Sequence, residues 1–225
     1  QGVSYVTDPT TPYVSSSQNK TALDFLQFPM QTLAYRAGDC DDLSILYAAL
    51  LEAAGIRMAL VTVPGHIYVA FDLGMRKEDA KATFSNPEAV IFPENEANAW
   101  LPIEITLVRK GFTEAWRAGA VDWQANMAKG AVKFLPVRDA WTAYPPVSSA
   151  RVVKDPVRLP APDAVFREFT AEMKRFMDAD FQPRVTQLQR ERGITFVYVT
   201  HSQSEDFAMA DRVVIMSKGE ISQIG

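Results

Sequence analysis

The only cysteine of the chain stands at the predicted start of a buried helix, and this placement constrains the fold more than any other feature. Apolar residues follow it at helical spacing: Leu43, Leu46, Tyr47, Leu50, Leu51 and Ala54. Leu46 and Leu50 are expected on the buried face, and Gly55 is a stop signal. At a helix N-terminus, unpaired N–H groups and the helix dipole favour a thiolate, so Cys40 is a candidate nucleophile.

Composition excludes several classes of function. The 225 residues are 48% hydrophobic and 22% charged, which is typical of a soluble globular protein. A net charge of −4 without a cluster of Lys and Arg argues against a nucleic-acid partner. The most apolar run, residues 43–51, is too short to span a membrane, so no transmembrane segment is expected. A single cysteine excludes an intrachain disulfide and a cysteine-based zinc site, and we expect no cofactor and no metal.

Three strands are predicted after the helix. Residues 57–63 and 66–73 alternate around a Pro-Gly turn, which predicts an antiparallel pair with His66 at the mouth of the second strand. The sequence WLPIEITL at residues 100–107 predicts a third strand, which contains Glu104. These strands would place both polar side chains near the cysteine helix.

Shorter elements are expected around this core. They are a strand at 3–6, a helix at 21–25 that Pro29 ends or kinks, a turn at 31–36, a polar stretch at 74–98, a helix at 113–127 and connecting pieces at 134–137 and 140–143. The four tryptophans are expected in the core or lining a cleft: Trp100, Trp116, Trp123 and Trp141.

Three motifs together resemble the bacterial transglutaminase-like domains of the papain-like cysteine enzyme superfamily. The motifs are GDCDDLSILYAALLEAAGI, PGHIYVAFD and WLPIEIT. In that family a nucleophilic Cys is followed by a His at the start of a strand and by an acidic residue in a strand that ends in a Thr. Cys40, His66 and Glu104 occupy these positions in this order, although the acidic residue is more usually Asp. The resemblance covers about residues 1–145 and implies an α+β fold with the Cys at a helix N-terminus packed on an antiparallel sheet.

The resemblance implies thiol-dependent acyl transfer on a protein or peptide substrate, as in a cysteine peptidase, an amidase or a transglutaminase. The imidazole of His66 would take the thiol proton, Glu104 would hold the right tautomer, and water or an amine would resolve the thioester. The alternative is a catalytically silent binding module of a bacterial envelope protein, with the envelope or periplasm as compartment. Each residue also has a plain structural interpretation, as a buried Cys, a strand-end His and a solvent-facing Glu. Asp41 and Asp42 fit helix N-terminal carboxylates better than metal ligands.

A Pro-rich stretch at residues 146–162 predicts a linker after the first domain. A helical stem is expected at 163–192, broken by Pro183. One side of its first helix is apolar: Val165, Phe166, Phe169, Met173, Phe176 and Met177. This amphipathic pattern predicts a helical partner.

The segment from about Leu188 onward resembles a different family, the nucleotide-binding domain of ABC transporter ATPases. The matching parts are a strand at 194–200, a switch histidine at His201, a helix at 202–210 and a strand pair at 212–217 and 220–224. No GxxxxGK[ST] phosphate loop occurs in the chain, so we expect no cofactor at His201. We expect a fusion with its join between Phe181 and Gly193, which makes 193–225 an ABC-like fragment. A third functional hypothesis is therefore a remnant of an ABC transporter ATP-binding subunit, which would be cytoplasmic.

Overall fold

The computed structural model describes residues 2–7, 25–84, 86–147, 160–178, 190–191, 214–217 and 220–224. These residues form a mixture of helices and strands. Contacts divide the chain into two compact units, Gln1–Glu172 and Met173–Gly225. Each unit is described by itself below.

The first unit carries most of the regular structure. Its helices are α2 (Pro29–Tyr35), α3 (Cys40–Ala53), α4 (Lys77–Thr83), α5 (Phe112–Met127) and α6 (Val137–Ala143), with short 3-10 helices η1 (Pro87–Ala89) and η2 (Ile105–Leu107). Its strands are β1 (Ser4–Tyr5), β2 (Ala37–Gly38), β3 (Met58–Val63), β4 (His66–Arg76), β5 (Asn98–Ile103) and β6 (Lys133–Pro136). Helix α7 (Pro162–Phe176) crosses the boundary between the two units.

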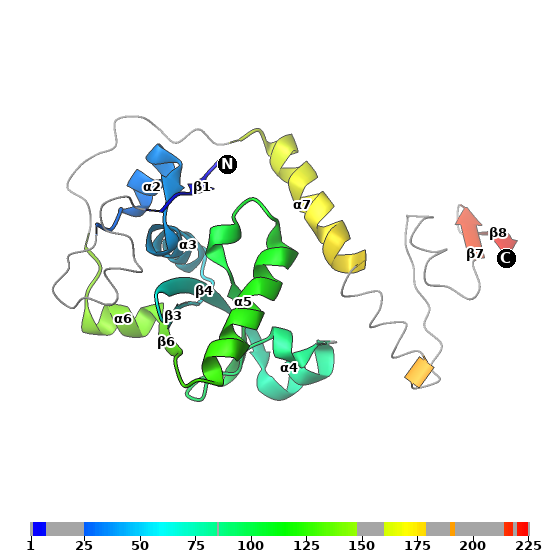
Figure 1. Cartoon of the computed structure of the whole chain (residues 1–225). Helices are drawn as coiled ribbons and strands as arrows, with labels where there is room; N and C mark the ends of the chain where they lie inside the picture. Colours follow the sequence, from blue (N-terminus) through cyan, green and yellow to red (C-terminus); the bar gives the residue numbers. More distant parts are fainter. Residues whose placement is uncertain are drawn as a thin grey trace. The chain divides into compact units, whose positions relative to one another are not determined.

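A four-stranded antiparallel sheet in the order β5-β4-β3-β6 forms the centre of the first unit. Successive residues of a strand point to opposite faces, so one strand contributes to two apolar layers. Val69 of β4 packs in one layer with Leu43 of α3, whereas Tyr68 packs in the other layer with Trp123 of α5. Helices α3 and α5 therefore cover opposite faces of the sheet, and they flank β4 in Figure 1.

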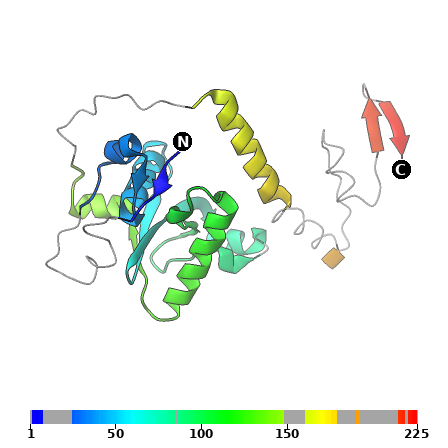
Figure 2. The same ribbon diagram turned by 45° about the horizontal axis from the view of Figure 1, so that its top comes forward.

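A small parallel sheet precedes α3. The Ser4 N–H donates to the Arg36 carbonyl at 2.9 Å, and the Val6 N–H donates to the Gly38 carbonyl at 2.9 Å. Strand β1 consequently lies beside the residues that lead into Cys40, and α2 packs on α3 (Figure 2). Gly38 lies against the first turn of α3. A Cβ atom added to it would stand 2.7 Å from the Asp42 Cβ, so this position requires glycine.

The hairpin of β3 and β4 and the helices α3 and α5 agree with the elements expected at 57–73, 40–54 and 113–127. Other expectations were wrong. Pro29 begins α2 instead of ending a helix, as the fixed φ of proline allows at a first helical position. The third strand ends at Ile103, so Glu104 lies just past β5 and caps η2.

Leu50 of α3 was expected on the buried face, and this expectation was wrong. Its side chain is 51% exposed, whereas Leu46 is 2% exposed. Leu43 and Leu46 are buried on the side of α3 that packs inward, whereas Leu50, one turn after Leu46, is largely exposed. The polar stretch at 74–98 also contains an unforeseen helix, α4, which buries only Ala80.

The second unit contains an antiparallel pair, β7 (Val214–Ser217) and β8 (Glu220–Ile224), in agreement with the strand pair expected there. Several expected elements lie outside the described residues. They are the strand at 194–200, His201, the helix at 202–210, the helix at 21–25 except Phe25, and most of the linker at 146–162 and of the later stem. Helix α7 exposes Val165, Phe166, Phe169 and Met173. Within the ranges that the structure describes, no helix has the length and apolar content needed to cross a membrane.

Candidate functional site

Cys40 is the first residue of α3 and is 4% exposed. Asp39 precedes it as the N-cap, and a reciprocal pair of hydrogen bonds fixes this start. The Asp42 N–H donates to Asp39 Oδ1 at 3.5 Å, and the Asp39 N–H donates to Asp42 Oδ2 at 3.4 Å. Such a capping box satisfies N–H groups that the helix itself cannot. The position of the thiol is therefore set by the sequence Asp-Cys-Asp-Asp around it.

Asp42 also ties an earlier segment to the helix start. Its Oδ1 accepts a hydrogen bond from the Gln27 N–H at 2.7 Å, and its Oδ2 accepts one from Gln27 Nε2 at 2.6 Å. Burial raises the pKa of Asp42, although the bonds from Gln27 oppose this rise. The carboxylate thus serves as a structural anchor for residues 25–28 next to the thiol.

His66 and Glu104 form an ion pair at the edge where β4 begins and β5 ends. His66 Nε2 lies 2.8 Å from Glu104 Oε2. The side chain of His66 is 27% exposed and that of Glu104 is 12% exposed. Glutamate, which is longer than the aspartate usual at this position of the resembled family, therefore reaches the imidazole.

The second oxygen of Glu104 is held by Thr106. The Thr106 hydroxyl donates to Glu104 Oε1 at 2.6 Å, and the Thr106 N–H donates to the same oxygen at 3.0 Å. The Glu104 N–H donates to the Ala115 carbonyl of α5 at 2.9 Å. Both the carboxylate and the main chain of Glu104 are consequently fixed, and its free oxygen is aimed at His66.

Electrostatics couples the three candidate residues. Burial lowers the pKa of His66, but hydrogen bonding to Cys40 and Glu104 and the charges of both outweigh burial and raise it to about 10. Burial raises the pKa of Glu104, but the bonds from His66 and Thr106 outweigh it and hold that pKa below its ordinary value. Cys40 and His66 are therefore coupled electrostatically, and the hydrogen bond of His66 Nε2 goes to Glu104.

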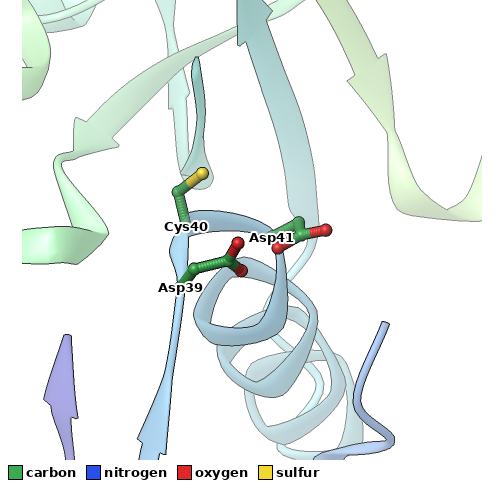
Figure 3. Close-up of side chains that lie close together, drawn as sticks. All are labelled: Asp39, Cys40 and Asp41. Carbon is green, nitrogen blue, oxygen red and sulfur yellow. The ribbon is translucent and has the colours of Figure 1, made fainter. Parts of the chain in front are cut away.

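The side chains of Asp39, Cys40 and Asp41 each offer one atom within 4.8 Å of the others (Figure 3). In Figure 3 the sulfur points out beyond the first turn of α3, whereas the carboxylates lie beside that turn. Asp39 Oδ1 and Asp41 Oδ1 both accept from the Asp42 N–H, the latter at 2.9 Å. The two carboxylates therefore act as caps of the helix.

The sequence predicted Cys40, His66 and Glu104 as one site. The structure joins His66 to Glu104 by a hydrogen bond, and Cys40 is among the groups that raise the pKa of His66. The anchoring roles of Thr106 and of the Gln27–Asp42 pair were missed. A hydroxyl two residues after an acidic side chain is a recognisable turn signal, which could have indicated Thr106. Gln27 carries no such signal, because its contact spans 15 residues of chain.

Known proteins resemble only part of this chain. No family model matches the chain, and no solved structure matches it. Part of the chain is similar to curated proteins, among them two spermidine/putrescine import ATP-binding proteins. The protein of Lawsonia intracellularis is 44% identical over 79 residues, which are 35% of this chain and 20% of that protein. That of Nitratidesulfovibrio vulgaris is 61% identical over 44 residues, which are 20% of this chain and 12% of that protein.

These matches confirm that a segment of the chain resembles ABC transporter ATPases, and they correct the other assignment. The curated relatives are ATP-binding proteins, so classifying the chain with transglutaminases or cysteine peptidases was wrong. The chain spans about a fifth or less of the length of the relatives it matches. What the comparisons establish is that this chain contains a segment similar to ABC transporter ATP-binding proteins.

Proposed function

We propose that Cys40, His66 and Glu104 carry out thiol-dependent acyl transfer. The observation that carries this proposal is the His66–Glu104 pair, with Glu104 Oε2 2.8 Å from His66 Nε2 and with Cys40 among the groups that raise the pKa of His66. A nucleophile, a base and a group that orients the base are the parts that covalent acyl chemistry requires. The support comes from this arrangement alone.

The proposed reaction begins with the thiolate of Cys40 and the imidazolium of His66, since a pKa of about 10 keeps His66 protonated at neutral pH. The sulfur attacks an acyl carbonyl, and a C–S bond forms. The bond from that carbon to the leaving group then breaks, and the leaving group takes its electron pair and the proton of His66. A thioester on Cys40 and a neutral imidazole remain.

The second half of the reaction reverses these roles. Neutral His66 takes a proton from an incoming water or amine, which attacks the thioester carbon. The C–S bond breaks, and the thiolate and the imidazolium are restored. The N–H of Cys40 is the first of α3 and has no intrahelical acceptor, so it can stabilise the negative oxygen that forms in each half.

A small activated ester tests the proposal, because Cys40 is buried and a small acyl donor reaches it most easily. We expect p-nitrophenyl acetate to acetylate Cys40, detected by intact mass, and Cys40→Ala to abolish the adduct. Loss of the imidazolium, which stabilises the thiolate and supplies the proton, should lower the acylation rate in His66→Ala by about 10²–10⁴-fold. His201→Ala, which changes the only other histidine, is the matched control. Equal rates in His66→Ala and the control would overturn the proposal and favour a binding module without catalysis.

A second proposal concerns the C-terminal segment, which the curated matches favour. We infer that it is a remnant of an ABC transporter ATP-binding subunit. Such subunits hold phosphates with a GxxxxGK[ST] loop, and the sequence of this chain contains none. Isothermal titration with ATP and magnesium should therefore give no saturable binding. Micromolar ATP binding that His201→Ala abolishes would show that the segment is a working nucleotide site instead.

A further inference from the structure

Tyr68 lies two residues after His66 on β4, so the two side chains point to the same face of the sheet. Tyr68 is fully buried, and its ring centroid is 5.9 Å from that of His66 with an angle of 31° between the planes. The tyrosine ring consequently forms one wall of the space in which the imidazole can turn. The proposed acyl transfer requires the imidazole to keep Nε2 at Glu104 while its other nitrogen serves Cys40.

Glu104 also borders Tyr68. Val69 of β4 pairs with Ile103 of β5 in antiparallel register. Tyr68 comes one residue before Val69 and Glu104 one residue after Ile103, just past the end of β5, so the two residues follow this last pair of the register on the same side. The charge of Glu104 is accordingly one of the influences that raise the pKa of Tyr68, after burial and Asp122. Tyr68 thus adjoins both members of the His66–Glu104 pair.

The far end of Tyr68 faces α5. Its hydroxyl oxygen and Asp122 Oδ2 are both buried, and among the described residues neither makes a hydrogen bond of good geometry. Burial raises the pKa of Tyr68, and the charge and hydrogen-bonding capacity of Asp122 raise it further. Two buried polar groups that influence each other electrostatically are therefore both left without a hydrogen bond among the described residues. Since buried polar groups are rarely left unpaired, a small rotation that joins the hydroxyl to the carboxylate is favourable.

The other side of Asp122 is fixed within the helix. Its Oδ1 accepts a hydrogen bond from Asn126 Nδ2 at 3.1 Å, one turn further along α5. The same helix accepts the Glu104 N–H at the Ala115 carbonyl. Helix α5 therefore bonds to the main chain of Glu104 and carries Asp122, whose charge acts on Tyr68.

We propose that Tyr68 is a positioning residue for His66 and that Asp122 holds the tyrosine ring in place. The inference rests on the proposed function of the Cys40 site. The ring restricts rotation of the imidazole, and the link from the hydroxyl to α5 restricts movement of the ring. Tyr68 touches no reacting atom, so its effect on the reaction passes through the orientation of His66.

The test compares substitutions that keep or remove the ring. Tyr68→Leu removes it, Tyr68→Phe keeps it without the hydroxyl, and Asp122→Asn keeps the shape of the partner. Phe71→Leu is the matched control, because it removes an aromatic ring from the opposite face of the same strand. Aromatic pairs contribute about 0.5–1.5 kcal/mol, so acetylation of Cys40 by p-nitrophenyl acetate should slow by about 2- to 12-fold in Tyr68→Leu. The rate in Phe71→Leu should match that of the parent, whereas the rates in Tyr68→Phe and Asp122→Asn should lie between those of the parent and Tyr68→Leu, because the ring is kept and its link to α5 is weakened.

A second readout separates positioning from general loosening of the fold. The titratable groups around the imidazole are Cys40 from α3, Glu104 after β5 and Tyr68 on its own strand. Tyr68→Leu should lower the His66 pKa measured by NMR and shift the pH profile of Cys40 alkylation by iodoacetamide, because a freely turning ring loses Glu104. Tyr68→Phe should restore both, and Phe71→Leu should change neither. Equal changes in Tyr68→Leu and Phe71→Leu would overturn the inference.

The outcome is distinct from failure of the proposed function. If the parent protein forms no acetyl adduct with the ester, acyl transfer is wrong. The NMR titration and the alkylation profile need no turnover, so they still decide whether Tyr68 orients His66.

Discussion

Gly119 of α5 lies so close to the main chain at Glu104 that a Cβ atom added to it would stand 3.1 Å from the Glu104 nitrogen. The same atom would be 3.0 Å from the Pro102 carbonyl carbon. Real Cβ atoms seldom approach backbone this closely, and backbone cannot yield as a flexible side chain can. The absence of a side chain at Gly119 therefore lets α5 come near enough to hold Glu104 through Ala115.

Gly119→Ala should consequently displace Glu104. Alanine in a helix interior is favoured over glycine by about 1 kcal/mol. Overpacking a core typically costs about 1–3 kcal/mol, so the clash should dominate and unfolding in urea should show a small net loss of stability. The rate of Cys40 acetylation should fall as well, because His66 loses its partner.

Val121→Ala is the control for Gly119→Ala, since Val121 is on the same helix and 70% exposed. Its free energy of unfolding should change by no more than about 0.5 kcal/mol. A Gly119→Ala protein that is more stable than the parent, with an unchanged acetylation rate, would show that α5 adjusts without moving Glu104.

The effect of Glu104 on the pKa of His66 is predicted to depend on both the charge and the length of the Glu104 side chain. Glu104→Gln removes the charge, and Glu104→Asp withdraws the carboxylate from a contact of 2.8 Å. Both changes should lower the pKa of His66, because the bond and the charge of Glu104 help to raise it. Titration of the His66 ring protons by NMR measures the shift, with His201→Gln to assign the two histidines. A His66 pKa that is the same in Glu104→Asp and the parent would contradict the importance of length.

His66 should also make stability depend on pH in a defined window. Its folded pKa is raised from 6.5 to about 10, so the folded state binds the proton more tightly than the unfolded chain does. The resulting stability is fully present below about pH 6.5 and is lost as the pH rises through about 10. The difference in free energy of unfolding between the parent and His66→Gln should therefore shrink over this window. Urea titrations at about pH 6, 8 and 10 measure it, and a difference that grows with pH would reverse the sign.

The cysteine helix and the hairpin were predictable because each rests on local periodicity. The His66–Glu104 contact was expected from short motifs. The end of β5 was not. The alternation of Ile103, Ile105 and Leu107 continues the pattern of a strand, but the Glu104 N–H bonds to Ala115 of α5, and η2 begins there. Such a contact joins distant parts of the chain, and no local pattern reports it. The helix α4 escaped notice for a related reason, since it buries only Ala80.

Leu46 and Leu50 test the packing of α3 as a matched pair. They lie one helical turn apart and carry the same side chain, but Leu46 is 2% exposed and Leu50 is 51% exposed. Leu46→Ala should cost about 2–5 kcal/mol through lost burial and a residual cavity. Leu50→Ala should cost less than about 0.5 kcal/mol. Equal losses would mean that Leu50 is covered in solution.

The C-terminal segment should be dispensable for the thiol site. Contacts divide the chain between Glu172 and Met173, and compact units of this kind usually fold separately. A protein that ends at residue 178 keeps α7 and every residue of the Cys40 site. Its Cys40 should react with iodoacetamide at the same rate and with the same pH profile as in the full chain.

Glu104→Gln is the positive control, because it should change the pH profile of Cys40 alkylation in both the full and the shortened protein. A shortened protein whose Cys40 reacts at a clearly different rate, while its unfolding transition is unchanged, would show that the ABC-like segment influences the thiol. In that case the two resemblances would belong to one working protein. With equal rates, the thiol chemistry is a property of residues 1–178, and the residues that follow contribute nothing to it.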